Sequence, residues 1–190
     1  MILSDRDILR SLKNGDLKIE PFDRDLLQPS TVDFRLDHKI RVFDNWQISL
    51  IDLAERKDVS RAVDIGEGGF FVIHPGEFIL GSTVERIKIP RDIAAKVEGK
   101  SSLGRLGLII HATAGYLDPG FKGNVTLEMS NLSRLSIKLY AGMKICQVAF
   151  LKMSSPVMIP YGSKKLGSKY QDQRGPTSSK IWKDFNHKQK

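Results

Sequence analysis

The sequence contains little cysteine and histidine, and this scarcity excludes several kinds of chemistry. Its 190 residues include one cysteine, Cys146, so no disulfide can form within the chain. A zinc hydrolase needs a closely spaced set of His and Cys ligands, such as H-x-E followed by P-C-x-x-C. The four histidines are scattered and complete no such set. We therefore expect no zinc, and hydrolysis by this chain would use water activated by a carboxylate.

Long apolar runs are absent as well. No stretch approaches the roughly 20 consecutive apolar residues that a membrane-spanning helix needs. The N-terminal residues, MILSDRDILR, carry acids and lack the apolar core of a signal peptide. Together with the single cysteine, these absences predict a cytoplasmic protein without a membrane partner.

The net charge of +8 is concentrated near the C-terminus. Residues 161–190 hold eight lysines and arginines against two acids, so they supply six of these net charges and leave the remainder near neutral. A nucleic-acid-binding domain more often carries a basic face on its folded body, so we expect no nucleic-acid partner. The basic segment is either a solvated tail or a tail that closes over an anionic ligand.

The first residues predict one short helix. Ser4 is a favourable N-cap, acids follow it, and Gly15 can end the helix. From Thr31 the pattern changes to an alternation in which Val32, Phe34 and Leu36 are separated by charged residues. This alternation predicts a half-buried strand whose charged residues face solvent.

Most of the remaining chain is typical of short strands separated by Gly and Pro turns. Segment 44–69 is predicted to be irregular. Strands are expected at 40–43, 70–73, 78–84, 93–97, 108–111, 124–128, 137–139 and 145–151. Many short strands without long helices indicate a mainly β sandwich or barrel, and they disfavour a doubly wound α/β fold.

The composition changes after Met153 to a polar stretch rich in Gly, Ser and Pro. Four aromatic residues interrupt it: Tyr161, Tyr170, Trp182 and Phe185. We divide the chain into a β domain, 1–160, and a C-terminal arm, 161–190, that orders against a ligand or a neighbouring subunit. A disordered tail is the alternative.

The most specific segment runs from Gly99 to Glu128 and opens with GKSSLGR. Closely spaced hydroxyls and cations can satisfy phosphate oxygens, and a solvated turn is the alternative. A Walker P-loop is excluded, because Ala94 stands where its first glycine is required.

Two carboxylates follow the GKSSLGR segment. Asp118 lies in GYLDPGFKG, where it is either a turn former or a catalytic acid. Glu128 ends a strand-like run and shares a face with Thr126. If that face points inward, Glu128 can transfer protons; an outward strand glutamate is the alternative. A phosphate cradle followed by two spaced carboxylates predicts hydrolysis of a nucleotide.

These motifs resemble the dCTP deaminase branch of the trimeric dUTPase-like superfamily. The resemblance extends from LSDRDI through QPSTVDFRLD and HPGEFILGST to GSKYQDQRGPT. Residues 115–123 resemble the motif G-x-I-D-x-x-Y/F-x-G, and residues 142–147 resemble G-x-x-I-x-Q. The implied fold is a distorted β-barrel or jelly-roll-like body with a short N-terminal helix. The implied assembly is a homotrimer with active sites between subunits and arms that close over the nucleotide.

The resemblance also implies roles for individual residues. Glu128 would activate water against C4 of cytosine, and Asp118 would orient water at the α-phosphate. The implied metal is Mg²⁺ held through the triphosphate of the substrate dCTP, with no direct protein ligand, and dTTP is the implied feedback inhibitor. The implied nucleotide-binding residues are Lys100, Ser101, Ser102, Leu103, Gly104, Arg105, Asp118, Thr126, Leu127, Glu128, Gln147, Tyr161, Lys169 and Gln173.

One short segment bears on the product. Thr113-Ala114-Gly115-Tyr116 resembles the bifunctional members, which convert dCTP and two waters to dUMP, ammonia and diphosphate for thymidylate precursor synthesis. Members that stop at dUTP resemble Thr-Ala-His-Arg, so Gly115 and Tyr116 are the predicted determinants of bifunctionality. A monofunctional deaminase that releases dUTP is the first alternative, and a non-catalytic basic nucleotide- or nucleic-acid-binding module is the second.

Overall fold

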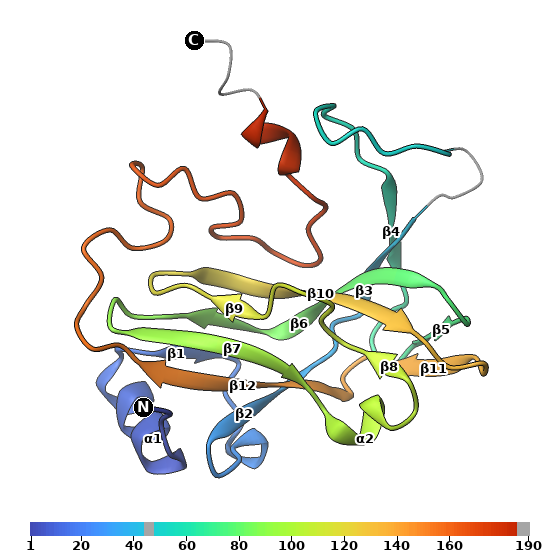
Figure 1. Cartoon of the computed structure of the whole chain (residues 1–190). Coiled ribbons are helices and arrows are strands. Elements are labelled where there is room, and N and C mark those ends of the chain that lie inside the picture. Colours follow the sequence, from blue (N-terminus) through green and yellow to red (C-terminus); the bar gives the residue numbers. More distant parts are fainter. Residues whose placement is uncertain (44–47, 186–190) are drawn as a thin grey trace.

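The structure is a computed structural model that describes residues 1–43 and 48–185. Part of the predicted irregular segment, 44–47, and the end of the predicted arm, 186–190, lie outside the described residues. The described chain consists mainly of antiparallel strands, with a helix at the N-terminal side and the C-terminal segment above the sheets (Figure 1).

The predicted N-terminal helix is present as α1, Asp5–Asn14. The Ser4 hydroxyl accepts a hydrogen bond from the Asp7 N–H, and Gly15 ends the helix in the left-handed region at φ 78°. Three further helical turns are too short for a periodic signal: η1 (Arg24–Leu26), α2 (Ser101–Gly104) and η2 (Ile181–Asp184). Among the described residues, no helix is both long and apolar enough to span a membrane.

Within residues 1–43 and 48–185, the strands form three antiparallel sheets. The largest has the order β4-β3-β6-β10-β8, with β1 also paired to β6. A second sheet has the order β2-β12-β7-β9, and β11 pairs with β5 in the third. The strands are β1 (Lys18–Glu20), β2 (Thr31–Arg35), β3 (Lys39–Phe43), β4 (Ser60–Asp64), β5 (Phe70–Ile73), β6 (Phe78–Lys88), β7 (Ile93–Gly99), β8 (Leu108–Ile109), β9 (Tyr116–Leu117), β10 (Lys122–Asn131), β11 (Ile137–Tyr140) and β12 (Lys144–Lys152).

This arrangement confirms the mainly β fold predicted from the sequence. The sheets are open, so within the described residues the jelly-roll-like part of the prediction fits better than a closed barrel. Each predicted strand has a counterpart, and the one expected at 108–111 is shorter, as β8. The prediction of an irregular 44–69 was wrong at β4, whose residues are half-buried or exposed and therefore show no alternation.

The core lies between the sheets and fixes the orientation of β10. Along this strand Val125, Leu127 and Met129 are buried, whereas Thr126 and Glu128 alternate with them on a partly exposed face. The predicted shared face of Thr126 and Glu128 is therefore confirmed. It points away from the core, so the outward alternative holds for Glu128, which is half-buried.

The half-buried prediction for β2 was wrong at Asp33. Its neighbours Val32 and Phe34 are fully buried, and Asp33 itself is only 2% exposed. The strand is thus buried on both faces. A carboxylate can occupy such a position because cations from other elements reach it.

Candidate functional site

The predicted phosphate segment follows β7 without a gap. Lys100 precedes α2, and its carbonyl accepts hydrogen bonds from the N–H groups of Leu103 and Gly104 at 3.0 Å each. This turn exposes the polar groups of Ser101, Ser102 and Arg105, while Leu103 is half-buried against the core. The residues predicted to bind phosphate therefore form one compact turn at the end of a strand.

The side chain of Lys100 contacts a buried carboxylate, that of Asp33. Its Nζ lies 2.6 Å from Oδ1 of Asp33, and Nζ of Lys144 lies 3.7 Å from Oδ2. Gln147, another predicted binding residue, is the direct register partner of Asp33 across β12 and β2. Asp33, Lys100 and Gln147 thus lie together at one end of the four-stranded sheet.

The two predicted catalytic carboxylates lie on different elements. Asp118 follows β9 and is exposed, whereas Glu128 is half-buried in the middle of β10. Thr126, on the same face as Glu128, accepts a hydrogen bond at Oγ1 from the N–H of Thr177 at 3.2 Å. Leu127, between Thr126 and Glu128, is fully buried and points into the core.

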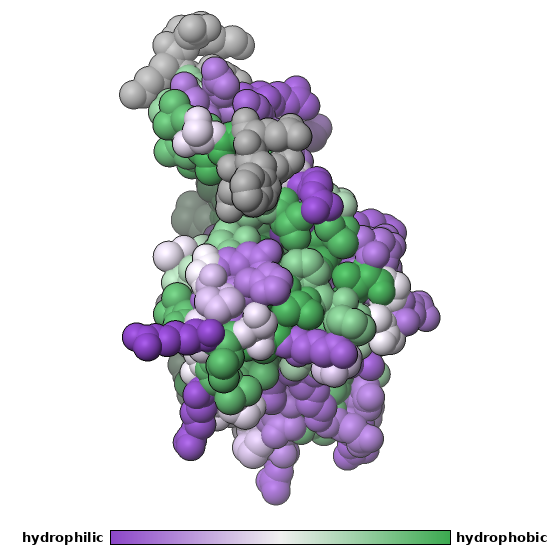
Figure 2. Space-filling model, turned by 90° about the vertical axis from the view of Figure 1, so that its right-hand side faces the viewer, coloured by the Kyte–Doolittle hydropathy of each residue, from purple (hydrophilic) through white to green (hydrophobic). Residues whose placement is uncertain are grey.

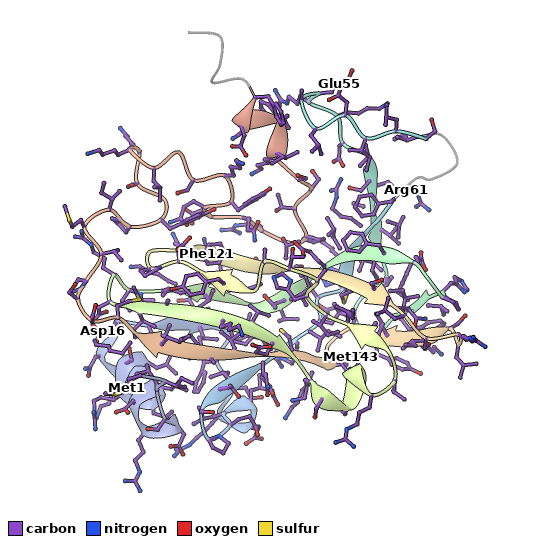
Figure 3. All side chains as sticks on the ribbon, viewed as in Figure 1. Met1, Asp16, Glu55, Arg61, Phe121 and Met143 are labelled. Atoms are coloured by element: carbon purple, nitrogen blue, oxygen red, sulfur yellow. The ribbon has the colours of Figure 1, made fainter. Side chains whose placement is uncertain are left out.

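Tyr161, the first residue of the predicted C-terminal arm, packs against the loop that carries Asp118. The Tyr161 ring centroid is 5.8 Å from that of Phe121, and its N–H donates to the carbonyl of Pro119 at 2.9 Å. Burial raises the pKa of the Tyr161 phenol, and the Asp118 carboxylate adds to the rise. Figure 3 labels Phe121 between the sheets and the arm. Tyr161 therefore stays neutral at physiological pH and close to Asp118.

The middle of the arm pairs with the start of β10. The Asn124 N–H donates to the carbonyl of Gln173 at 3.1 Å, and the Gln173 side chain donates to the Asn124 carbonyl at 2.7 Å. Asp172 contacts both Arg86, at 2.6 Å, and Lys122, at 3.0 Å. Together these contacts fasten the arm to the body by backbone hydrogen bonds and charge pairs.

Further along, the arm is held mainly by its own residues. The Tyr161 hydroxyl accepts a hydrogen bond from the Tyr170 N–H at 3.1 Å, and Lys169 forms an ion pair with Asp184. Trp182, in η2, lies beneath the guanidinium of Arg56 at 5.0 Å, beside the loop where Figure 3 labels Glu55. The arm therefore extends from the Asp118 loop to the loop before β4.

The predicted site residues form two groups within one chain. The arm residues, Asp118 and the exposed face of β10 are close together. The phosphate segment and Gln147 form the other group, and Figure 1 shows α2 below the sheets and the arm above them. One chain therefore carries two partial sites on different sides of its sheets.

Gly115 lies where the backbone leaves no room for a side chain. Its carbonyl accepts a hydrogen bond from the Val97 N–H at 2.7 Å. A Cβ atom at this position would lie 2.7 Å from the Val97 carbonyl oxygen and 3.3 Å from the His111 ring. The adjacent Tyr116 is exposed on β9, opposite Lys96. The predicted bifunctionality pair thus consists of one sterically restricted position and one open side chain.

Two groups at or near the site were missed from the sequence. The alternation along 31–36 predicts that Asp33 faces solvent, and only its nearness to Lys100 gives it a part in the site. Asp172 gave no sequence signal except its place between the two glutamines of the YQDQ segment. Within the described part of the chain, no three His, Cys, Asp or Glu side chains are grouped as they would be to hold a metal.

The described residues define a mainly β fold of open antiparallel sheets. A solved structure of 2′-deoxycytidine 5′-triphosphate deaminase from Agrobacterium tumefaciens matches with a TM-score of 0.61 and 25% identity, over 78% of this chain and 47% of that chain. The match therefore spans about half of that chain's length.

A family model described as dCTP deaminase-like matches residues 2–153. The chain is 54% identical over 189 residues to a dUMP-forming dCTP deaminase from Corynebacterium glutamicum, covering 99% of this chain and all of the relative. It is 55% identical over 187 residues to one from a Nocardioides species, covering 98% of each. The chain belongs to the dCTP deaminase family, which confirms the membership and the enzyme class predicted from the sequence.

Proposed function

We propose that this enzyme converts dCTP and two waters to dUMP, ammonia and diphosphate. One observation carries the proposal: the chain matches enzymes named as dUMP-forming dCTP deaminases along almost its whole length. The Gly115-Tyr116 pair supports the same product, because this segment of the sequence resembles the bifunctional members.

In the first reaction, water adds to C4 of cytosine and the amino group leaves as ammonia. Glu128 takes up the protons of the water in turn and delivers one to N3 of the ring and one to the departing amino group. Its half-buried position, beside Thr126 and beneath the arm, suits a carboxylate that exchanges protons with a bound base. Leu127, which also belongs to the proposed nucleotide site, holds this stretch of β10 in place through its buried side chain.

In the second reaction, water attacks the α-phosphorus and diphosphate leaves. Asp118 orients this water, and Tyr161 packs against the loop that carries Asp118. The phosphate chain is bound by the turn from Lys100 to Arg105. Mg²⁺ would enter with the triphosphate and would neutralise part of its charge.

The active enzyme is a homotrimer in this proposal, with each site completed by a neighbouring copy. The separation of the phosphate segment from the arm supports it, because one copy can supply one group and its neighbour the other. Large apolar side chains on the surface also support it, and Figure 2 shows apolar residues among charged ones on one end of the molecule. Exposed apolar residues include Phe70, Leu106, Leu132, Leu135 and Tyr140. Gel filtration with light scattering at micromolar concentration tests the trimer.

Product analysis tests the function directly. Purified protein is incubated with dCTP and Mg²⁺, and nucleotides, ammonia and diphosphate are followed over time. We expect dUMP to rise together with equal amounts of ammonia and diphosphate. Persistent dUTP would establish the monofunctional deaminase instead. An absence of ammonia, with salt-sensitive oligonucleotide binding, would establish the non-catalytic module.

Regulation by dTTP belongs to the same proposal. A thymine nucleotide shares the triphosphate and deoxyribose of the substrate, so the same binding residues accept it. We expect dTTP to lower the rate at subsaturating dCTP. An unchanged rate at a tenfold excess of dTTP would remove this part of the proposal.

A further inference from the structure

The carboxylate of Asp33 is the feature that the proposed reaction does not use. It lies on β2 between two fully buried apolar residues and is 2% exposed. A carboxylate taken out of water loses several kcal/mol of solvation unless cations and hydrogen bonds replace the water. Its partners therefore stabilise the folded state.

The two partners of Asp33 differ in how closely they approach. Lys100 Nζ lies 2.6 Å from Oδ1, within hydrogen-bonding distance, whereas Lys144 Nζ is 3.7 Å from Oδ2. Lys144 also donates to the carbonyl of Asp25, at 3.3 Å, so its ammonium is shared with another element. Lys100 is therefore the principal partner of the buried carboxylate.

Lys100 keeps access to ligands while it contacts Asp33. Its side chain is 24% exposed, and an ammonium has three N–H donors, of which Asp33 occupies one. A free lysine has four flexible carbons and loses much rotamer freedom when a ligand fixes it. Since Asp33 already holds the Lys100 side chain in place, a phosphate that binds Lys100 does not have to immobilise that side chain.

We propose that Asp33 is a positioning residue, which holds the Lys100 ammonium at the base of the phosphate segment and thereby strengthens binding of the triphosphate. The inference rests on the proposed function only for the identity of the ligand. Asp33 is also the register partner of Gln147, so its contact with Lys100 lies beside a second predicted binding residue. Asp33 itself does not contact the substrate in this proposal.

A double-mutant cycle with inorganic tripolyphosphate tests the contact without any need for turnover. Calorimetric affinities are measured for wild type, Asp33→Asn, Lys100→Met and the double variant. We expect Asp33→Asn to weaken binding by about three- to tenfold, the range for losing one pre-ordered long side chain. In the Lys100→Met background, Asp33→Asn should cause no further loss.

The matched control is Glu98→Gln, since Glu98 is another register partner of Gln147 but is exposed. It should leave the tripolyphosphate affinity unchanged. Equal losses from Glu98→Gln and Asp33→Asn would show a general charge effect and overturn the proposal. An additive double variant, or an Asp33→Asn variant that binds as well as wild type, would also overturn it.

Steady-state kinetics separate positioning from a merely structural role. For dCTP, Asp33→Asn should raise KM by a similar factor and leave kcat within about twofold, because Glu128 and its strand are untouched. A loss confined to kcat would contradict the proposal. If wild type released no ammonia from dCTP, the proposed function would fail, while the tripolyphosphate cycle would still decide the role of Asp33.

Stability measurements cover the case in which Asp33→Asn does not fold. Lys100 lies in an accessible turn, so Lys100→Met probes the same contact from the other side. It leaves the buried carboxylate with only the more distant Lys144, and we expect a lower urea midpoint than for wild type. An unchanged midpoint would show that the contact carries no free energy and would overturn the proposal.

Discussion

The backbone N–H of Thr177 donates to Oγ1 of Thr126 at 3.2 Å, and this bond joins the C-terminal arm to the strand that carries Glu128. The partly exposed face of β10 is thereby covered by a segment 51 positions away in sequence. The arm and β10 are thus joined, so under the proposed function changes in either should affect the same reaction.

Glu128→Gln should abolish deamination and leave the fold intact. The change keeps the shape of the side chain but removes the proton-transfer group, whose contribution is worth roughly 10²–10⁴-fold in rate. Ammonia release from dCTP measures the effect, and circular dichroism with the urea midpoint checks the fold. The control is Glu67→Gln, at an exposed turn residue, which should retain full activity. Turnover within tenfold of wild type would remove Glu128 from its proposed role.

Asp172→Asn should loosen the arm. Asp172 is the only described non-glycine residue with a left-handed backbone, at φ 57°, and asparagine tolerates that conformation, so the substitution removes the charge without adding strain. It removes the pairs with Arg86 and Lys122. Exposed ion pairs contribute about 0–1 kcal/mol, so we expect KM for dCTP to rise by at most about fivefold, and faster trypsin cleavage after Arg174.

The ion pairs of Asp172 with Arg86 and Lys122 have a defined dependence on pH and salt. The hydrogen bond from the Lys122 ammonium lowers the pKa of Asp172, and Arg86 lowers it further. The pKa of Asp172 is lower when the arm is docked. Its ion pairs therefore stabilise docking fully above the ordinary aspartate pKa, and this stabilisation is lost as the pH falls through the lowered pKa. Trypsin protection should therefore be constant from pH 6 to 8 and fall in high salt. Asp16→Asn, at an exposed residue after α1, should behave as wild type.

Gly115→Ala should destabilise the protein by about 1–3 kcal/mol, the usual cost of forcing extra volume into a packed site. The added methyl group would lie 2.7 Å from the carbonyl oxygen of Val97, which is backbone and cannot move aside freely. Urea unfolding measures the loss. The control is Gly99→Ala on the same strand as Val97, whose new methyl group would meet only Ile110 at 3.5 Å. Equal stability of the two variants would contradict the steric account.

Cys146 should react with thiol reagents only after unfolding. The side chain is fully buried, and burial raises the pKa of its thiol, with the carboxylates of Glu85 and Asp33 adding to the rise. The reactive species is the thiolate, which is therefore scarce and inaccessible in the folded chain. Absorbance with a disulfide reagent at pH 8 should show no release without urea and one equivalent with it. Rapid labelling of the native protein would contradict this burial.

Local patterns in the sequence predicted a large share of the fold. The caps of α1 and the alternation along β10 are decided by neighbouring residues, so both could be inferred directly. Asp33 could not, because its burial depends on two lysines that reach it from the end of β7 and from β12. From a local pattern, a charged residue is predicted to face solvent. The cations that allow Asp33 to be buried come from distant parts of the chain, so only the tertiary structure reveals them.

The candidate site was predicted from motifs and not from local patterns. The phosphate segment and the two carboxylates stand in specific sequence contexts, so the amino-acid sequence alone identifies them as candidates. The pairing of Gln173 with Asn124 joins residues 49 positions apart, and neither residue type signals it. The division of the predicted site into two groups depends on the arrangement of the sheets, which no motif specifies.

The pairing of the arm with β10 has a consequence for solubility. β10 bonds to β6 along nearly its whole length, but β8 pairs with its other edge only at Ser130 and Asn131. In the described chain, the arm adds a parallel bridge between Gln173 and Gly123 on that edge. An unpaired strand edge is a template for other chains. The arm therefore also shields β10 against intermolecular strand addition, and a chain shortened before Gln171 would expose an aggregation-prone edge.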